Sequence, residues 1–264
     1  MLLRLCSVDY LNSAPLVWGL LHGPPQDLFD LTFRIPSECA DLVASGAVDI
    51  GNIPVIEMSR QNLEMVPGVG VAARGAVRSI LLVSKRPLAQ IRTLAADSSS
   101  RTSVTLTRIV LSRRYGVEPL FLPSAPDLAA MLDQADAALI IGDPALRLDP
   151  SSLPYLVADL GQEWTEMTGL PMVFAVWAGH KRHITSAVVK ALADSCSYGR
   201  EHLEDIVKID GAARGISEAL ARDYLTHHIV NELGPREYEG LELYLRYARE
   251  ALAAQASARG ELVV

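Results

Sequence analysis

The sequence predicts an α/β protein made of two similar lobes with a cleft between them. In the first third of the chain, short β-like runs alternate with helical ones, and a second alternating unit follows over residues 77–142. From about residue 184 the chain reads as helices alone. Strand–helix alternation with short connections is typical of sheets whose parallel strands are joined by covering helices.

The first unit can be read in order from its hydrophobic periodicity. A strand, a helix, a strand, a helix and a strand are expected at residues 2–8, 12–21, 31–35, 37–46 and 48–54. Asn12 or Ser13 can cap the first helix, whose first turn holds Pro15, and a closing glycine ends the second helix.

The second unit repeats the pattern. Strands are expected at 79–85 and 93–97, followed by a hydroxyl-rich turn and a helix that Gly116 ends after Tyr115. The strand "PLFLP", the helix "PDLAAMLDQ" and a strand at 137–142 complete the unit. A looser acidic loop then leads to an apolar strand at 169–179.

Composition narrows the class of protein. Half of the 264 residues are hydrophobic, yet no apolar run reaches the roughly 18 residues of a membrane span. A net charge of −7 without a long basic run argues against nucleic acid as a partner. The start "MLLRLCSVDYLN" lacks a signal-peptide pattern, which predicts a cytoplasmic protein. Cys6, Cys39 and Cys196 have no paired spacing, so we expect reduced thiols and no zinc site.

The stretch "DSSSRTSVTLT" (97–107) carries seven hydroxyl side chains at the expected start of a helix. One or two would be enough for a cap. The surplus favours an anion cradle, in which Arg101 adds a bidentate grip and the helix amides join the hydroxyls of Ser99, Ser100, Thr102 and Ser103. The alternative is an ordinary cap with a solvent-facing arginine. The stretch has no GK[ST] ending, so it is not a nucleotide P-loop.

Three further turns follow buried strands, where open α/β sheets bind ligands. "SVDYLN" presents Tyr10 and Asn12; the Asn12 amide either contacts a substrate oxygen or caps its helix. "GNIP" places Asn52 at the cleft, and "IGDPAL" places Asp143 where it orients a ligand hydroxyl or caps the next helix. The histidines form no metal-binding or catalytic pattern, so no metal is expected.

Five segments in order, "SVDYLNSAPL", "GAVDIGNIPVIE", "DSSSRTSV", "LIIGDPAL" and "DLGQEWTEMTGLPMVFAVWA", resemble the chorismate dehydratases of the futalosine route to menaquinone. The likeness covers about residues 4–250. It implies a fold like that of type II periplasmic binding proteins, each lobe having a mixed, mainly parallel sheet. Lobe one would be residues 1–84 plus 178–264, with the C-terminal helices packed on it, and lobe two residues 85–177.

The resemblance also implies an activity, the loss of water from chorismate to give 3-[(1-carboxyvinyl)oxy]benzoate, with no cofactor. It makes Asn12 and Ser79 the catalytic residues that face the substrate. Substrate contacts are then expected from the residues singled out in the turns, Tyr10, Asn52, Ser99, Ser100, Arg101, Thr102, Ser103 and Asp143.

The turns offer no histidine, lysine or cysteine as a base. We therefore expect the enolpyruvyl carboxylate of the substrate to take the C3 proton, with Asp143 as the alternative base. Competing functions are a solute-binding protein, the later lyase of the pathway that acts on a cyclic futalosine derivative, and the ligand domain of a transcription regulator. The sequence leaves open whether the chain is a monomer or a homodimer.

Overall fold

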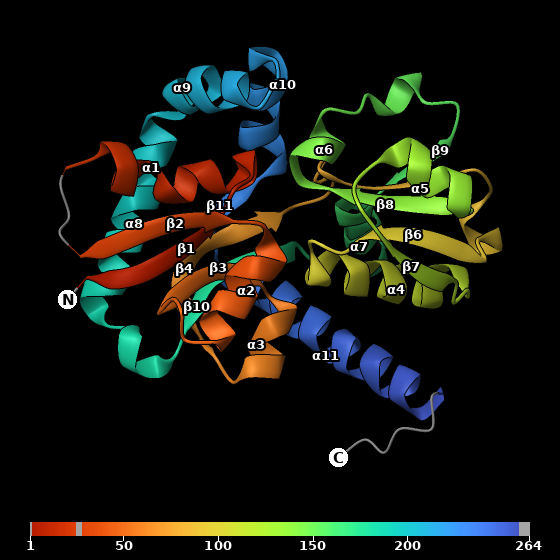
Figure 1. Ribbon diagram of the computed structural model, residues 1–264, viewed down its shortest axis with the longest axis horizontal. Coiled ribbons are helices and arrows are strands. Elements are labelled where there is room, and N and C mark those ends of the chain that lie inside the picture. Colours follow the sequence, from red (N-terminus) through yellow and green to blue (C-terminus); the bar gives the residue numbers. More distant parts are fainter. Residues whose placement is uncertain (1, 25–27, 259–264) are drawn as a thin grey trace.

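The computed structural model describes residues 2–24 and 28–258 and has two α/β lobes side by side (Figure 1). The sheet of the first lobe has the strand order β11-β4-β10-β3-β1-β2. Its strands are β1 Leu3–Val8, β2 Phe29–Arg34, β3 Ile50–Pro54, β4 Glu64–Ala73, β10 Met172–Gly179 and β11 Val230–Glu232.

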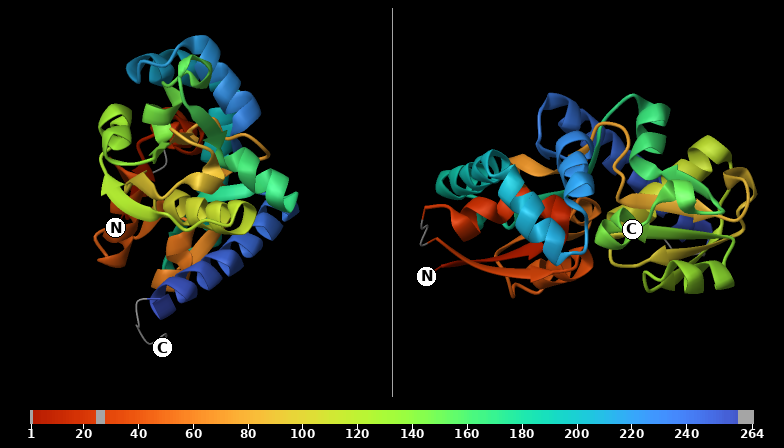
Figure 2. Two further views of the ribbon diagram at one scale, coloured as in Figure 1. Left: turned by 90° about the vertical axis from the view of Figure 1, so that its right-hand side faces the viewer. Right: turned by 90° about the horizontal axis from the view of Figure 1, so that it is seen from above.

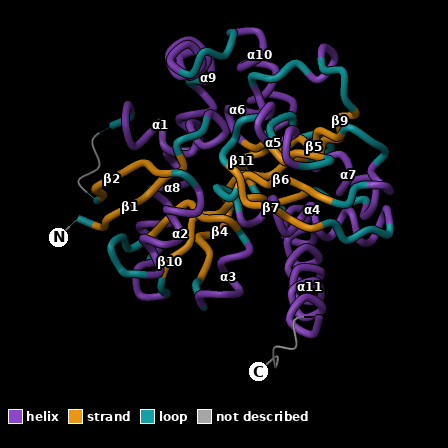
Figure 3. The backbone as a smooth tube through the Cα atoms, turned by 45° about the vertical axis from the view of Figure 1, so that its right-hand side comes forward, coloured by secondary structure: helices purple, strands orange, loops and turns teal. Residues whose placement is uncertain are grey.

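The sheet of the second lobe has the strand order β7-β6-β8-β5-β9. Its strands are β5 Ile80–Ser84, β6 Thr93–Asp97, β7 Leu120–Ser124, β8 Ala137–Ile141 and β9 Leu156–Asp159. Figure 3 shows helices flanking the strands of both lobes. The predicted two-sheet α/β fold is therefore confirmed.

Both sheets are mixed, and most strands of each sheet run in one direction, as the resemblance implied. β1 pairs parallel with β2 and β3, and β6 pairs parallel with β7 and β8. The pairs β10–β3, β10–β4, β11–β4, β5–β8 and β5–β9 are antiparallel. β5 and β10 are the strands by which the polypeptide crosses between the lobes, and each runs antiparallel to both of its neighbours.

Short and long helices cover both sheets. The helices of lobe one are α1 Ala14–His22, α2 Pro36–Ala44, α3 Ile56–Gln61, α8 Ser186–Glu201, α9 Leu203–Ile206 and α10 Glu218–Asp223, with the π-helical segments η5 Val207–Gly211 and η6 Tyr224–His228. Those of lobe two are α4 Arg101–Tyr115, α5 Leu128–Gln134, α6 Gly142–Leu146 and α7 Leu160–Thr168. Short 3-10 turns are η1 Leu11–Ser13, η2 Leu88–Gln90, η3 Pro150–Ser152 and η4 Lys181–His183.

The lobes divide at other residues than those expected. β5 belongs to the second sheet and β10 to the first, so the crossovers lie between β4 and β5 and between α7 and β10. The sequence boundaries at 84 and 178 are wrong by the length of one strand each. Both strands are buried and apolar along their length, which is why sequence alone could not assign them to a lobe.

The last helix, α11 Pro235–Ala258, does not pack on lobe one alone. It contacts α3 and β10 of lobe one and α4 of lobe two. In Figure 1 this helix starts beside α3 and extends below α4, and the right-hand view of Figure 2 shows the two lobes side by side from above. The Tyr244 hydroxyl on α11 donates to the Thr102 carbonyl of α4 at 3.1 Å, which is one of several contacts of this helix with lobe two.

Two further findings concern elements and groups that the sequence did not place. The acidic loop contains β9 and α7, and β4 was not expected at all. The Sγ atoms of Cys6 and Cys39 lie 2.9 Å apart in the buried core, and both thiols are free. None of the described helices combines the length and the apolar character needed to cross a membrane.

Candidate active site

A small cavity of about 40 Å³ lies between the lobes, where the four ligand-binding turns of the sequence analysis meet. The turn after β1 supplies Tyr10 and Asn12, and the turn after β6 supplies Ser100 and Ser103. Ser79 lines it from the first crossover. The rest of the lining is mainly apolar: Val8, Ser13, Pro36, Pro54, Val71, Ile80, Ile141, Gly142, Phe174 and Ala175.

The hydroxyl-rich stretch forms the start of α4. The Ser100 side chain is the N-cap and accepts from the Ser103 amide at 3.3 Å, and its Oγ lies 2.9 Å from that of Ser103. Gly116 ends the helix with a φ of 68°. Thr105 and Thr107 donate to carbonyls one turn back within the helix. The surplus of hydroxyls is therefore divided between the cavity and the helix itself.

Arg101 does not line the cavity. Its guanidinium lies 2.8 Å from Asp41 and 3.4 Å from the buried Glu57, both on lobe one. The expected bidentate grip on an anion is thus replaced by an ion-pair cluster between the lobes. The sequence could not show this because Asp41 is 60 residues away.

Three other predicted contact residues also lie behind the cavity wall. Thr102 is buried, and its Oγ1 accepts from the Ile56 amide at 3.5 Å. The Ser99 hydroxyl lies 3.4 Å from that of Tyr10, and this contact joins the lobes. The Asn52 amide donates to the Ser13 hydroxyl at 3.2 Å. These residues support the lining and are not part of it.

Asp143 neither lines the cavity nor caps its own helix. Its Oδ1 accepts from the Leu11 amide at 3.0 Å and its Oδ2 from Arg214 at 2.9 Å. Burial raises the pKa of Asp143, while the Leu11 amide and Arg214 oppose that rise. Both oxygens of Asp143 therefore accept hydrogen bonds from residues of lobe one. These two contacts, called the Asp143 latch below, join the lobes.

One of the two predicted catalytic residues, Ser79, bonds a buried tyrosine that was not expected at the site. The Tyr224 hydroxyl donates to the Ser79 Oγ at 2.7 Å. The Asn12 Oδ1 accepts from the Ser13 hydroxyl at 3.1 Å. No sequence signal marks Tyr224, which is 145 residues from Ser79.

The cavity has an uncharged wall. None of the described residues that line it is ionised at neutral pH, and burial raises the pKa of Tyr10 to about 12. Asp97 is a buried carboxylate at the end of β6 that the sequence analysis passed over; its Oδ1 accepts from the Ser99 amide at 2.9 Å. Burial raises the pKa of Asp97, and it stands outside the lining. The remaining polarity comes from hydroxyls, an amide and the N-terminus of α4.

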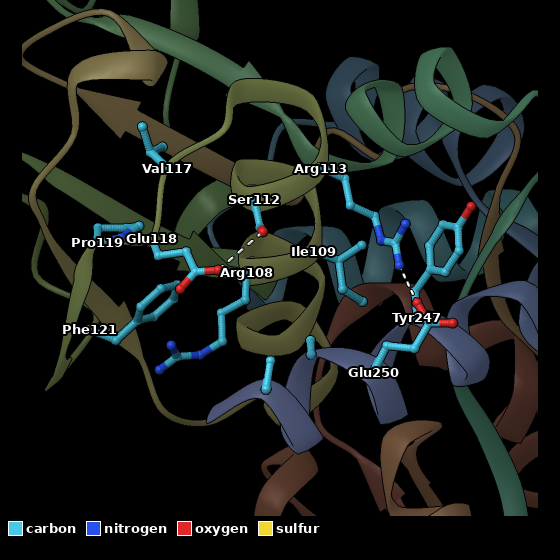
Figure 4. A pocket seen from close by; sticks show the side chains of 12 residues that line it. Arg108, Ile109, Ser112, Arg113, Val117, Glu118, Pro119, Phe121, Tyr247 and Glu250 are labelled. Atoms are coloured by element: carbon cyan, nitrogen blue, oxygen red, sulfur yellow. Dashed lines mark hydrogen bonds and ion pairs between the residues drawn. The ribbon is translucent and has the colours of Figure 1, made fainter. Parts of the chain in front are cut away.

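A larger hollow of about 340 Å³ lies on the outer surface between α4 and α11 (Figure 4). Arg108 stacks 3.6 Å from the Phe121 ring, and Arg113 lies 3.7 Å from the Tyr247 ring and pairs with Glu250. Its lining shares no residue with the cavity between the lobes. The cations there already contact Phe121 of β7 and Tyr247 and Glu250 of α11, so we place the chemistry in the smaller cavity.

No group of three or more potential metal-ligating side chains occurs within residues 2–24 and 28–258. The cavity wall itself offers hydroxyls and one amide, which are poor ligands for a transition metal.

Fold and site define a two-lobed α/β protein with a ligand cavity between its lobes, and solved structures of that class are similar to it. A protein of Archaeoglobus fulgidus matches with a TM-score of 0.71 and 16% identity, covering 97% of each chain. The periplasmic aliphatic sulphonate binding protein of Escherichia coli matches with a TM-score of 0.68 and 16% identity, covering 96% of this chain and 92% of its own. The periplasmic-binding-protein-like fold is confirmed.

The particular family follows from sequence: the chain belongs to the menaquinone biosynthesis family, whose pattern matches residues 3–250. A chorismate dehydratase of Thermus thermophilus is 29% identical over 235 residues, covering 82% of this chain and 84% of the relative. Another, of Campylobacter jejuni, is 28% identical over 175 residues, covering 64% and 63%. The resemblance found in the sequence is therefore confirmed at the level of the family.

Proposed function

We propose that this protein is a chorismate dehydratase, a carbon–oxygen lyase that acts in the cytoplasm on the route to menaquinone. The observation that carries the proposal is that Asn12 and Ser79 line the same cavity as Ser100 and Ser103 at the start of α4. The likeness to two chorismate dehydratases supports it. The product would be 3-[(1-carboxyvinyl)oxy]benzoate.

The start of α4 suits one end of a dianionic substrate. Ser100 and Ser103 present hydroxyls to the cavity, and the first amides of the helix carry the positive end of its dipole. We assign the ring carboxylate of chorismate to this end. Asn12 and Ser79 then face the enolpyruvyl side chain and the C4 hydroxyl.

Because the described lining of the cavity carries no charged side chain, it bears on which group removes the C3 proton of the substrate. In the proposed step, the C3–H electron pair forms the new ring double bond, and the C4–O bond breaks. The C3 proton passes to the enolpyruvyl carboxylate and on to the departing hydroxide, which leaves as water. Asp143 has both oxygens bonded elsewhere, so the substrate supplies its own base, and Asn12 and Ser79 hold it in the reactive conformer.

Substrate entry requires the lobes to part, because the cavity is far smaller than a chorismate molecule. The Tyr10–Ser99 contact, the Arg101–Asp41 pair and the Asp143 latch surround the cavity and would open together. Closure over the substrate then excludes water, which strengthens each polar contact inside.

The test is to incubate the purified protein with chorismate and follow the product by mass spectrometry. We expect an aromatic product lighter by one water, formed much more slowly by Ser79→Ala. Ser84→Ala is the matched control, because Ser84 is also buried but lies at the far end of β5. Binding of chorismate without turnover would favour a solute-binding protein, and turnover of the cyclic futalosine derivative would favour the later lyase.

A further inference from the structure

Tyr224 is the first residue of the π-helical segment η6, and its side chain is 1% exposed. π-Helical turns are rare and often occur at functional sites. The hydroxyl of Tyr224 reaches the start of β5, where it donates to the Ser79 Oγ at 2.7 Å. Tyr224 itself is outside the cavity lining, so it acts on the cavity through Ser79.

Hydrogen bonds lie behind both predicted catalytic residues. Asn52 donates to Ser13 at 3.2 Å, and Ser13 donates to the Asn12 Oδ1 at 3.1 Å. Behind Ser79, the donor is the Tyr224 hydroxyl. Such bonds are stronger in a buried setting than in water.

The hydrogen bond from Tyr224 fixes the direction of one proton. A serine hydroxyl has a single hydrogen, and the Ser79 oxygen already accepts from Tyr224. In the described part of the structure Ser79 has no other side-chain hydrogen bond, and it lines the cavity. Its own hydrogen is thereby left to point at whatever oxygen occupies the cavity.

We propose that Tyr224 is a positioning residue for the elimination, which aims the Ser79 hydroxyl hydrogen at the enolpyruvyl group of the substrate. This role rests on the proposed function and names a residue that acts behind one of its two catalytic side chains, Ser79. Burial raises the pKa of Tyr224, so its hydroxyl remains a donor throughout the neutral range.

The plain alternative is a core tyrosine whose hydroxyl has merely found a buried partner. Tyr244 is such a residue and serves as the matched control. It is 0% exposed, and its hydroxyl donates to a backbone carbonyl at 3.1 Å, away from the cavity lining. Tyr224→Phe and Tyr244→Phe each remove one buried hydroxyl and keep the ring.

The experiment measures kcat and KM for chorismate in the wild type, both phenylalanine variants, Ser79→Ala and the Ser79→Ala/Tyr224→Phe double variant. We expect Tyr224→Phe to lower kcat about tenfold with KM changed less than about twofold, as the loss of one neutral hydrogen bond suggests. Tyr244→Phe should keep the wild-type kcat, although thermal unfolding should show a similar loss of stability in both.

The double variant separates positioning from packing. If Tyr224 acts through Ser79, adding Tyr224→Phe to Ser79→Ala should cost less than about twofold more. A full further tenfold loss, or a wild-type kcat in Tyr224→Phe, would overturn the role of Tyr224. A wild-type protein that leaves chorismate unchanged would overturn the proposed function, and this role with it.

Discussion

Arg214 of lobe one donates to the Asp143 carboxylate of lobe two at 2.9 Å, and the same guanidinium donates to Asp9 at 2.8 Å. Asp143 is 6% exposed, so its charge is largely removed from water. Arg214 therefore holds a buried carboxylate in place. It also joins the turn after β1, which contains Asp9, to α6, which contains Asp143.

Replacement of Arg214 should for this reason lower the free energy of unfolding of the protein. Arg214→Ala leaves the Asp143 carboxylate buried without its cation, and we expect a loss of about 3 kcal/mol in the free energy of unfolding. Denaturant titration measures it. Adding Asp143→Asn to Arg214→Ala should restore part of the loss, because no charge is then left unpaired. A loss below about 1 kcal/mol in the single variant would show that the pair is screened by solvent.

The Arg101 cluster gives a prediction on substrate affinity. If Arg101 favours the closed lobes through Asp41, Asp41→Asn and Arg101→Lys should both raise KM for chorismate and change kcat little. Steady-state kinetics of the two variants checks this. If Arg101 instead grips the substrate, Arg101→Lys should raise KM while Asp41→Asn leaves it at the wild-type value.

Gly142 meets two constraints at once. Its φ is +66°, and a Cβ built there would lie 2.7 Å from the Tyr10 ring. Gly116 shares the positive φ, at +68°, but has open space around it. We expect Gly116→Ala to lose about 1 kcal/mol of stability and keep its kcat/KM. Gly142→Ala should also lose kcat/KM because Tyr10 is displaced; equal activity in both variants would contradict this.

Acid stability should depend on Asp49. Its hydrogen bonds with Arg4 lower the Asp49 pKa from 3.8 to about 2. A lowered folded-state pKa stabilises the protein above the unfolded-state pKa, and this stability is lost as the pH falls from about 4 toward 2. Asp49→Asn should therefore lower Tm at pH 6 and flatten its decline below pH 4. Parallel Tm curves for wild type and variant would refute the assignment.

Local signals predicted much of the fold. β6 begins and ends at the expected residues, and Gly116 ends α4 as its position indicated. α7 was missed although Asp159 and Gln162 have the spacing of a capping box, and Asp159 does accept from two amides of the first turn. β4 was missed because Pro67 and Gly68 in its first half read as chain breakers.

The sequence predicted which turns form the site better than it predicted which residues of those turns line the cavity. Tyr10, Asn12, Ser79, Ser100 and Ser103 line the cavity, whereas Asn52, Ser99, Arg101, Thr102 and Asp143 support it from behind. What separates the two groups is tertiary pairing: the partners Asp41 and Arg214 lie 60 and 71 residues from the side chains they hold. Local sequence carries no signal for such contacts, and the same holds for Tyr224.

The central claim is that the elimination uses no base from the protein, and the kcat of Asp143→Asn tests it most directly. Calorimetry should first establish that the variant binds chorismate, and Ser79→Ala serves as the impaired reference. We predict that Asp143→Asn loses no more than about tenfold in kcat, the cost of a weakened latch. A loss of about 10⁴-fold with chorismate binding intact is the size expected for removal of a general base, and it would contradict the account.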